Sequence, residues 1–238
     1  MELCVVELQS VDSTNDHAKM LAREGAASGT VVFSHAQTKG RGRQGNNWQS
    51  LNGNLFMSII LRPDLSPAQI GQLSFLAALS LADVIRNISS HSLNIGLKWP
   101  NDVLIDGRKA AGILLETEST NKGKVDWVVI GIGVNIVHAP EGFASLKSAG
   151  IENLTAKDLM LQLSRAIIQN YRQLELNGFG EFRRRWLEYA VNIGKIIKAR
   201  LPQETVEGVF TGIDDTGALL LDMPDGSQRT VASGEVFL

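Results

Sequence analysis

Residues 95–137, IGLKWPNDVLIDGRKAAGILLETESTNKGKVDWVVIGIGVNIV, alternate apolar runs of strand length with short turns. Asp106-Gly107 is a two-residue hairpin signal between two of these runs, and Asn121-Lys122-Gly123 gives a second turn. Strands joined by such short connections pair with one another in antiparallel fashion. The stretch therefore predicts four successive strands of a largely antiparallel sheet.

The residues on either side of this stretch add strands and helices to the same domain. Further strands are predicted over residues 3–8, 30–36 and 55–61. Helices are predicted over residues 12–25, 66–88, 155–176 and 179–190. The apolar positions of the second helix are too dense for a surface helix, so we expect it to be mostly buried.

The pattern changes near Val191, where short strand-like runs begin. They are punctuated by turn signals at Asp215-Thr216-Gly217 and Asp225-Gly226, which is typical of a small β-barrel. We therefore predict an α+β fold in two domains. Residues 1–189 form a mixed, largely antiparallel sheet packed with helices, and residues 190–238 form the barrel.

Composition excludes several classes of protein. Twenty-three Lys and Arg oppose 25 Asp and Glu, so no global positive field attracts nucleic acid or an anionic membrane. Cys4 is the only cysteine, which rules out an intrachain disulfide and a thiolate zinc site. The acidic N-terminus does not look like a secretory signal, and no apolar run reaches the roughly 20 residues of a membrane span. We expect a soluble, cytoplasmic protein.

Residues 38–48, TKGRGRQGNNW, concentrate cations and glycines beside one tryptophan. The glycines let the backbone approach a ligand, and the guanidiniums of Arg41 and Arg43 are planar forks suited to phosphate or carboxylate. Trp48 offers a face on which a purine can stack. A solvated loop and a single-stranded RNA site are the alternatives at this point.

Lys98-Trp99-Pro100-Asn101-Asp102 closes an apolar strand, because Pro100 stops the ladder and Asn101 and Asp102 favour a tight turn. One interpretation is a plain turn with a solvated lysine. The functional interpretation is that Lys98 faces an anion while Asn101 and Asp102 hold Mg²⁺ through oxygen and water.

Two further motifs allow a structural or a functional interpretation. Gly131-Ile132-Gly133-Val134-Asn135 lacks the third glycine of a dinucleotide fingerprint, and glycines inside a strand mark a close approach of ligand or backbone. If buried, Asn135 needs hydrogen bonds, either from an adenine edge or from the protein. Asp12-Ser13-Thr14-Asn15 is either a helix cap or a site for a small polar ligand.

The order and spacing of DSTN, QTKGRGRQGNNW, KWPND, GRKAAGILLE and GIGVN resemble those of the biotin protein ligases. The resemblance runs from about residue 11 to residue 137, and the terminal GEVFL is similar to the family's small C-terminal domain. It implies the catalytic fold of the biotin and lipoate ligases followed by an SH3-like barrel. The likeness is to the monofunctional class, which lacks an N-terminal DNA-binding domain.

The resemblance implies an ATP-dependent, AMP-forming enzyme. Biotin's carboxylate attacks the α-phosphate of ATP, giving biotinyl-5′-AMP and pyrophosphate, and a carrier lysine then attacks that anhydride. No enzyme nucleophile is needed, so catalysis depends on alignment and on offsetting the charge of two anions. The implied partner is a biotin carboxyl carrier protein of a biotin-dependent carboxylase. We expect no DNA, no membrane and a possible homodimer.

The resemblance also assigns site residues. The implied catalytic cations are Lys98, Arg41 and Arg43. The implied biotin contacts are Ser13, Thr14, Asn15, Gln37, Arg41, Gly42, Arg43, Lys98 and Gly112. The implied nucleotide contacts are Arg43, Trp48 and Asn135. The residues themselves, and not the resemblance, suggest Asn101 as a further nucleotide contact and Asp102 as a ligand of Mg²⁺.

Two other functions compete with this hypothesis. A lipoate–protein ligase shares the fold and the adenylation logic, but the Arg-Arg, Gly-rich motif of that group is missing from the sequence. A non-enzymatic nucleic-acid-binding module would use the GRGR loop and bind in a salt-sensitive way.

Overall fold

The protein, seen here in a computed structural model, is described over residues 1–119 and 125–237, so the predicted turn at Asn121-Lys122-Gly123 lies outside the described residues. Its larger part is a seven-stranded sheet with the order β1-β2-β3-β7-β6-β5-β4. The strands are β1 (Cys4–Leu8), β2 (Thr30–Ser34), β3 (Leu55–Leu61), β4 (Ile95–Lys98), β5 (Asp102–Ile105), β6 (Arg108–Ser119) and β7 (Val125–Val134). The β1–β2 pair is parallel and the other pairs are antiparallel, as the sequence predicts.

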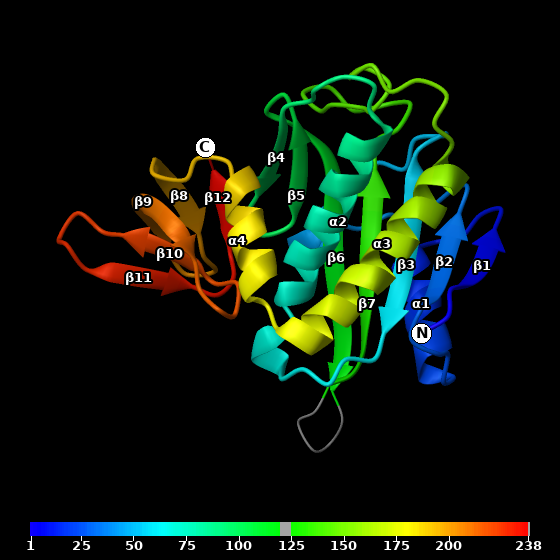
Figure 1. Cartoon of the computed structure of the whole chain (residues 1–238), viewed down its shortest axis with the longest axis horizontal. Helices are drawn as coiled ribbons and strands as arrows, with labels where there is room; N and C mark the ends of the chain where they lie inside the picture. Colours follow the sequence, from blue (N-terminus) through cyan, green and yellow to red (C-terminus); the bar gives the residue numbers. More distant parts are fainter. Residues whose placement is uncertain (120–124, 238) are drawn as a thin grey trace.

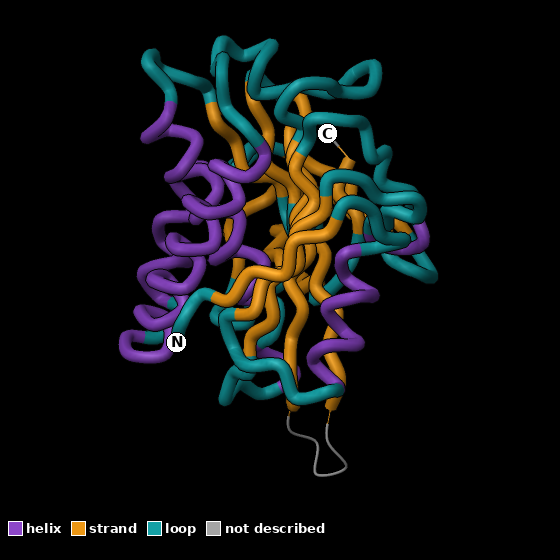
Figure 2. Tube along the Cα trace, turned by 90° about the vertical axis from the view of Figure 1, so that its right-hand side faces the viewer, coloured by secondary structure: helices purple, strands orange, loops and turns teal. Residues whose placement is uncertain are grey.

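Helices cover both faces of this sheet (Figures 1 and 2). The α-helices are α1 (Thr14–Arg23), α2 (Gln72–Ile88), α3 (Ala156–Asn177) and α4 (Gly180–Tyr189), and short 3₁₀ turns are η1 (Arg43–Gly45) and η2 (Pro67–Gln69). Helices α2 and α3 pack together on one face, whereas α1 contacts β2, β3 and β7 from the other.

Strand alternation divides the core in two. On β7, Val128, Ile130, Ile132 and Val134 join the large core beneath α2 and α3. The alternate residues Trp127 and Val129 belong instead to a small core, which they form with Val32, Ile60, Ala18 and Ala22. Farther along the same face, the next alternate residues of β7 are Gly131 and Gly133. The small core therefore gives way to bare backbone on the side of the sheet that α1 covers.

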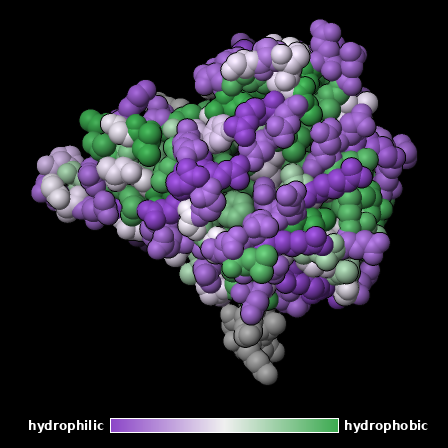
Figure 3. Space-filling view, viewed as in Figure 1, coloured by the Kyte–Doolittle hydropathy of each residue, from purple (hydrophilic) through white to green (hydrophobic). Residues whose placement is uncertain are grey.

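Helix α2 is the most apolar of the four. The segment Pro67–Ile88 is long and apolar enough to cross a membrane by length and composition, but 78% of its most apolar window is buried inside the fold. The surface seen from the side of α3 and α4 is mainly hydrophilic, with apolar residues in small groups (Figure 3). The apolar character of α2 is therefore that of a core helix, as predicted.

A second sheet follows α4, and its five antiparallel strands have the order β11-β10-β9-β8-β12. They are β8 (Ile196–Arg200), β9 (Thr205–Ile213), β10 (Leu219–Asp222), β11 (Gln228–Val231) and β12 (Glu235–Phe237). The predicted α+β class with a small C-terminal β unit is confirmed. The predicted boundary between residues 189 and 190 falls in the link between α4 and β8.

The turn between β9 and β10 fastens the small sheet to the large domain. Gln72 Nε2 donates to the Asp215 carbonyl at 2.7 Å, and Trp99 Nε1 donates to the Gly217 carbonyl at 3.0 Å. Arg183 Nε donates to the Ile213 carbonyl at 2.6 Å. These bonds fix the turn from three separate elements of the large domain.

Gly217→Ala should destabilise the protein more than Gly226→Ala does. Both glycines have positive φ (87° and 82°), so each substitution costs about 1 kcal/mol in backbone strain. A Cβ at Gly217 would also overlap the Phe75 ring, whereas one at Gly226 meets no atom within 4 Å. We expect Gly217→Ala to cost roughly 2 kcal/mol more in urea unfolding. Equal losses in the free energy of unfolding for the two variants would show that the turn accommodates the new methyl group without strain.

Candidate active site

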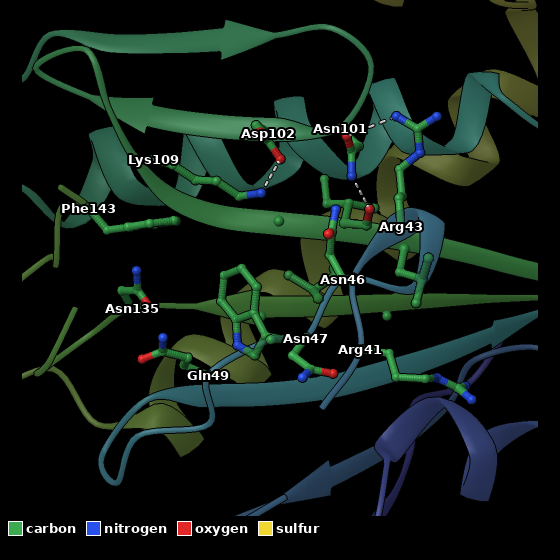
Figure 4. A pocket seen from close by; sticks show the side chains of 18 of the residues that line it. Arg41, Arg43, Asn46, Asn47, Gln49, Asn101, Asp102, Lys109, Asn135 and Phe143 are labelled. Atoms are coloured by element: carbon green, nitrogen blue, oxygen red, sulfur yellow. Dashed lines mark hydrogen bonds and ion pairs between the residues drawn. The ribbon is translucent and has the colours of Figure 1, made fainter. Parts of the chain in front are cut away.

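A cavity of about 580 Å³ opens where the glycine-bearing face of the sheet extends beyond α1. Figure 4 shows side chains around it from β5, β6, the residue that follows β7 and the basic segment 41–49. Each residue that the sequence nominated lines this one cavity: Ser13, Thr14, Asn15, Gln37, Arg41, Gly42, Arg43, Trp48, Lys98, Asn101, Asp102, Gly112 and Asn135. The fold therefore brings together motifs that are up to about 120 residues apart in the chain.

The floor of the cavity is bare backbone under an aromatic ring. Gly112 and Gly133 lie opposite each other in the β6–β7 register. A Cβ at Gly133 would come within 2.5 Å of Trp48 Cε2, and one at Gly112 within 3.1 Å of Trp48 Cζ3. The indole of Trp48 therefore lies directly on the two glycines. Its Nε1 is buried without a hydrogen-bond partner among the described residues, so it keeps a free donor.

The DSTN motif forms more than a helix cap. Ser13 occupies the N-cap position of α1 but makes no side-chain capping bond. The Thr14 backbone N–H donates to Gln37 Oε1 at 2.8 Å, and Ser58 Oγ donates to the side-chain carbonyl oxygen of Asn15 at 2.6 Å. A Cβ at Gly131 would overlap the Asn15 amide, so that amide also approaches bare backbone. The start of α1 thus presents a buried polar cluster to the cavity.

Arg41 joins a four-charge cluster with Asp16, Lys19 and Glu116. Its Nη2 lies 2.7 Å from Asp16 Oδ1 and 3.0 Å from Glu116 Oε2, and Lys19 Nζ lies 2.6 Å from Glu116 Oε1. Burial would raise the pKa of Glu116, but hydrogen bonds from Lys19 and Asn15 and the nearby cations hold that pKa below its ordinary value. Glu116 therefore stays ionised at neutral pH.

Arg43 takes a different direction from Arg41 (Figure 4). Its Nη1 donates to the Gly234 carbonyl at 3.0 Å and lies 3.5 Å from Asn101 Oδ1. Burial lowers the pKa of Arg43, while the charges of Asp102 and Glu235 oppose that shift. The sequence analysis interprets both guanidiniums as forks suited to phosphate or carboxylate. In this structure they diverge, because each finds acceptors within the protein.

Lys109 is the residue that motif reasoning did not select. Its Nζ lies 2.6 Å from Asp102 Oδ1 and 5.8 Å from the centroid of the Trp48 ring (Figure 4). Lys98 lines the same cavity and has no salt-bridge partner among the described residues. The one available signal for Lys109 was its place in GRKAAGILLE, just after the Asp106-Gly107 hairpin.

Asn135 finds the internal partners that its burial demands. Its Nδ2 donates to the Ala144 carbonyl at 3.2 Å, and Asn54 Nδ2 lies 3.5 Å from its Oδ1. The interpretation of Asn135 as a residue with hydrogen bonds inside the protein is confirmed. It still lines the cavity, beside the edge of the glycine floor.

The small sheet also reaches the cavity, which the sequence did not predict. Glu235 and Val236 of β12 are among its lining residues. With Arg43 bonded to Gly234, the C-terminal strand contributes both a wall and an anchor for the basic segment.

Comparison with known proteins gives this site a context. Residues 7–135 match the model of the Biotin/lipoate A/B protein ligase family, and residues 193–238 match the Biotin protein ligase C terminal domain. The chain is 37% identical to the biotin–acetyl-CoA-carboxylase ligase of Paracoccus denitrificans, over 97% of this chain and 98% of that protein. It is 34% identical to the enzyme of the same name from Mycobacterium tuberculosis, over 94% and 85% respectively.

Solved structures agree with the sequence matches. The structure of a biotin protein ligase from Aquifex aeolicus in complex with biotin and ATP superimposes with a TM-score of 0.83 at 27% identity. The superposition covers 98% of this chain and 97% of the Aquifex chain. Both the large domain and the small sheet of the present chain therefore have counterparts there.

Gly133→Ala should loosen the basic segment, because the new Cβ would collide with the Trp48 ring. With the ring displaced, the segment loses contact with the sheet, and locally weakened segments are cut faster by proteases. We expect trypsin to cleave after Arg41 and Arg43 severalfold faster than in the wild type. Gly212→Ala, in strand β9 with no atom within 4 Å of the new Cβ, is the control. An unchanged cleavage rate would contradict the role of the glycine floor.

Proposed function

The chain belongs to the biotin/lipoate A/B protein ligase family, and we propose that it is a biotin protein ligase that forms biotinyl-5′-AMP from biotin and ATP and transfers biotin to a carrier lysine. One observation carries this proposal. A single cavity combines a buried polar cluster, two lysines, three arginines and a tryptophan lying on bare backbone. A bicyclic urea, a carboxylate, a phosphate and a purine need those four kinds of contact.

The polar cluster at the start of α1 suits the ureido ring of biotin. Thr14, Asn15 and Gln37 are linked by hydrogen bonds to one another or to Ser58, so their directions are fixed before a ligand arrives. Fixed donors and acceptors bind a polar ring without the entropic cost of ordering them. Ser13 and the backbone at Gly42 complete this end of the cavity.

The cations suit the meeting of a carboxylate with the α-phosphate. Lys98 lacks an acidic partner among the described residues, whereas Lys109 is held by Asp102 at 2.6 Å. Both amines line the cavity, and each would offset charge that builds as the carboxylate attacks the phosphorus. Arg41 and Arg43 would close over the product once phosphate oxygens compete with their present partners.

The nucleotide base belongs beside Trp48 and Asn135. An indole that lies on a glycine floor and lines the cavity can stack its other face with adenine. Asn135 sits at the edge of the same floor and already has one amide hydrogen bonded to Ala144. Its position suits the polar edge of the base.

Mg²⁺ is proposed at Asp102, together with phosphate oxygens. Among the described residues no group of three or more His, Cys, Asp or Glu is arranged to hold a metal ion. Magnesium in nucleotide sites commonly uses one or two carboxylates and takes its remaining ligands from phosphate and water. Asp102 fits that donor set, and Asn101 lies next to it in the cavity. The ion would supply charge neutralisation for the phosphates.

The proposed protein partner is a biotin carboxyl carrier protein, since the curated relatives are named for ligation to acetyl-CoA carboxylase. We propose no DNA partner, because the net charge is −2 and both arginines of the basic segment are bonded within the fold. A cytoplasmic location and a homodimer remain predictions. The exposed free thiol of Cys4 is in keeping with a reducing compartment.

ATP–pyrophosphate exchange tests the function directly. Purified protein with labelled pyrophosphate should catalyse exchange that depends on added biotin, because adenylation is reversible and needs no carrier. Lipoate in place of biotin separates the two branches of the family, and exchange with lipoate alone would overturn the proposal. Salt-sensitive binding of labelled RNA without exchange would favour the nucleic-acid alternative.

Lys98→Met and Lys109→Met should each lower the exchange rate at saturating biotin by about 100-fold, with a smaller change in the KM for biotin. The reason is that a cation facing the reacting anions contributes more in the transition state than in the ground state. Lys147→Met, an exposed lysine outside the cavity, is the control. A lysine variant that behaves like this control would lose its catalytic assignment.

A further inference from the structure

Glu116 of β6 lies at the junction between the charge cluster and the polar cluster. Its Oε2 accepts from Asn15 Nδ2 at 2.8 Å and from Arg41 at 3.0 Å, while its Oε1 accepts from Lys19 at 2.6 Å. Glu116 does not line the cavity itself. It can act on the proposed ligand only through its partners that do line the cavity, Asn15 and Arg41.

The carboxylate determines which end of the Asn15 amide faces which neighbour. An ionised carboxylate can only accept, so the NH₂ group of Asn15 must face Glu116. The side-chain carbonyl oxygen of Asn15 is then directed at Ser58, and it accepts the single hydroxyl hydrogen of Ser58 at 2.6 Å. Ser58 therefore has no hydrogen left for Thr14.

Thr14 Oγ1 has two oxygen neighbours but only one hydrogen to donate, so one of these contacts lacks a hydrogen. Thr14 Oγ1 lies 2.8 Å from Ser58 Oγ and 3.1 Å from Gln37 Oε1. Gln37 Oε1 already accepts the Thr14 backbone N–H at 2.8 Å, which fixes the direction of the Gln37 amide. The one hydroxyl hydrogen of Thr14 can serve only one of its two neighbours. The buried cluster is thus rich in acceptors, and a ligand N–H would relieve the deficit.

We propose that Glu116 is a positioning residue that sets the hydrogen-bond polarity of the Asn15–Ser58–Thr14 relay, so that the cavity accepts an N–H from the ring of the ligand. The inference rests on the proposed function, in which that ring is the ureido ring of biotin. Its two N–H groups are the donors that an acceptor-rich cluster selects. The ion pairs with Lys19 and Arg41 keep Glu116 charged and hold it in place.

Glu116→Gln tests the relay because the amide can donate to Asn15 and let its side chain reverse. Asn15 would then donate to Ser58, Ser58 would donate to Thr14, and the cluster would no longer need a hydrogen from the ligand. We expect the KM for biotin in ATP–pyrophosphate exchange to rise about tenfold or more, with the KM for ATP little changed. Glu118→Gln, the same change on an exposed side chain of the same strand, is the matched control.

The double variant Asn15→Asp with Glu116→Gln separates polarity from mere structural support. The carboxylate introduced at position 15 can only accept, so Ser58 must donate to it again. The amide introduced at position 116 can donate to that carboxylate from the other side. The pair has exchanged its carboxylate and its amide with the shape of each side chain kept. We expect the KM for biotin to return to within about threefold of the wild type, although the pairing with Arg41 stays altered.

Each outcome bears on one claim. If the wild-type protein shows no biotin-dependent ATP–pyrophosphate exchange, the proposed function is wrong, and the relay proposal that rests on it fails as well. An active wild type whose Glu116→Gln variant keeps the KM of the Glu118→Gln control would overturn the inference. Loss of biotin affinity that the double variant does not recover would show that Glu116 acts through its ion pairs. Thermal unfolding of each variant confirms that the proteins compared are folded.

Discussion

The site depends on a row of positions where β6 and β7 carry no side chain. Strand alternation forces one face of β7 to be large and apolar, because that face packs against α2 and α3. The opposite face does not need large apolar side chains where it extends past the end of α1. There Gly112, Gly131 and Gly133 leave the backbone uncovered by side chains of their own. Any Cβ at Gly131 or Gly133 would strike Asn15 or Trp48. The approach of both polar and aromatic groups to the sheet therefore rests on these glycines.

The charges around this floor are paired within the protein, which explains how a chain of net charge −2 maintains a local concentration of cations. Arg41 and Lys19 share Asp16 and Glu116, and Lys109 forms an ion pair with Asp102. Unpaired cations brought this close would repel one another and would lose hydration on burial. An incoming phosphate or carboxylate has to compete with the resident acids, so the cations are held in place without being freely available. Lys98, which has no acidic partner among the described residues, is one exception, and Arg43, which is bonded to the Gly234 carbonyl, is another.

Local sequence patterns were sufficient to predict the strands and the Asp106-Gly107 turn, since alternation and hairpin signals act over a few residues. Most of the predicted site residues came instead from the resemblance to the biotin protein ligases. The local patterns did not predict hydrogen bonds between residues that lie far apart in the chain. The separation of Arg41 from Glu116 is 75 residues, and that of Arg43 from Gly234 is 191. The internal partners of the two guanidiniums therefore could not be predicted from the basic segment alone. Lys109 was overlooked because its role depends on the β5–β6 register, which sets Asp102 opposite Gly112.

The small sheet is part of the site and not merely an appendage to it. Three side chains of the large domain hold its β9–β10 turn, so its orientation is fixed at one end. At the other end, β12 follows the Gly234 carbonyl that binds Arg43, and it places Glu235 in the cavity wall. A carbonyl bonded to a half-buried guanidinium is a contact that anchors the basic segment without neutralising its charge. Arg43 thus keeps its positive charge beside Asp102 and Glu235. Its position is fixed by the second sheet, through the bond to the Gly234 carbonyl.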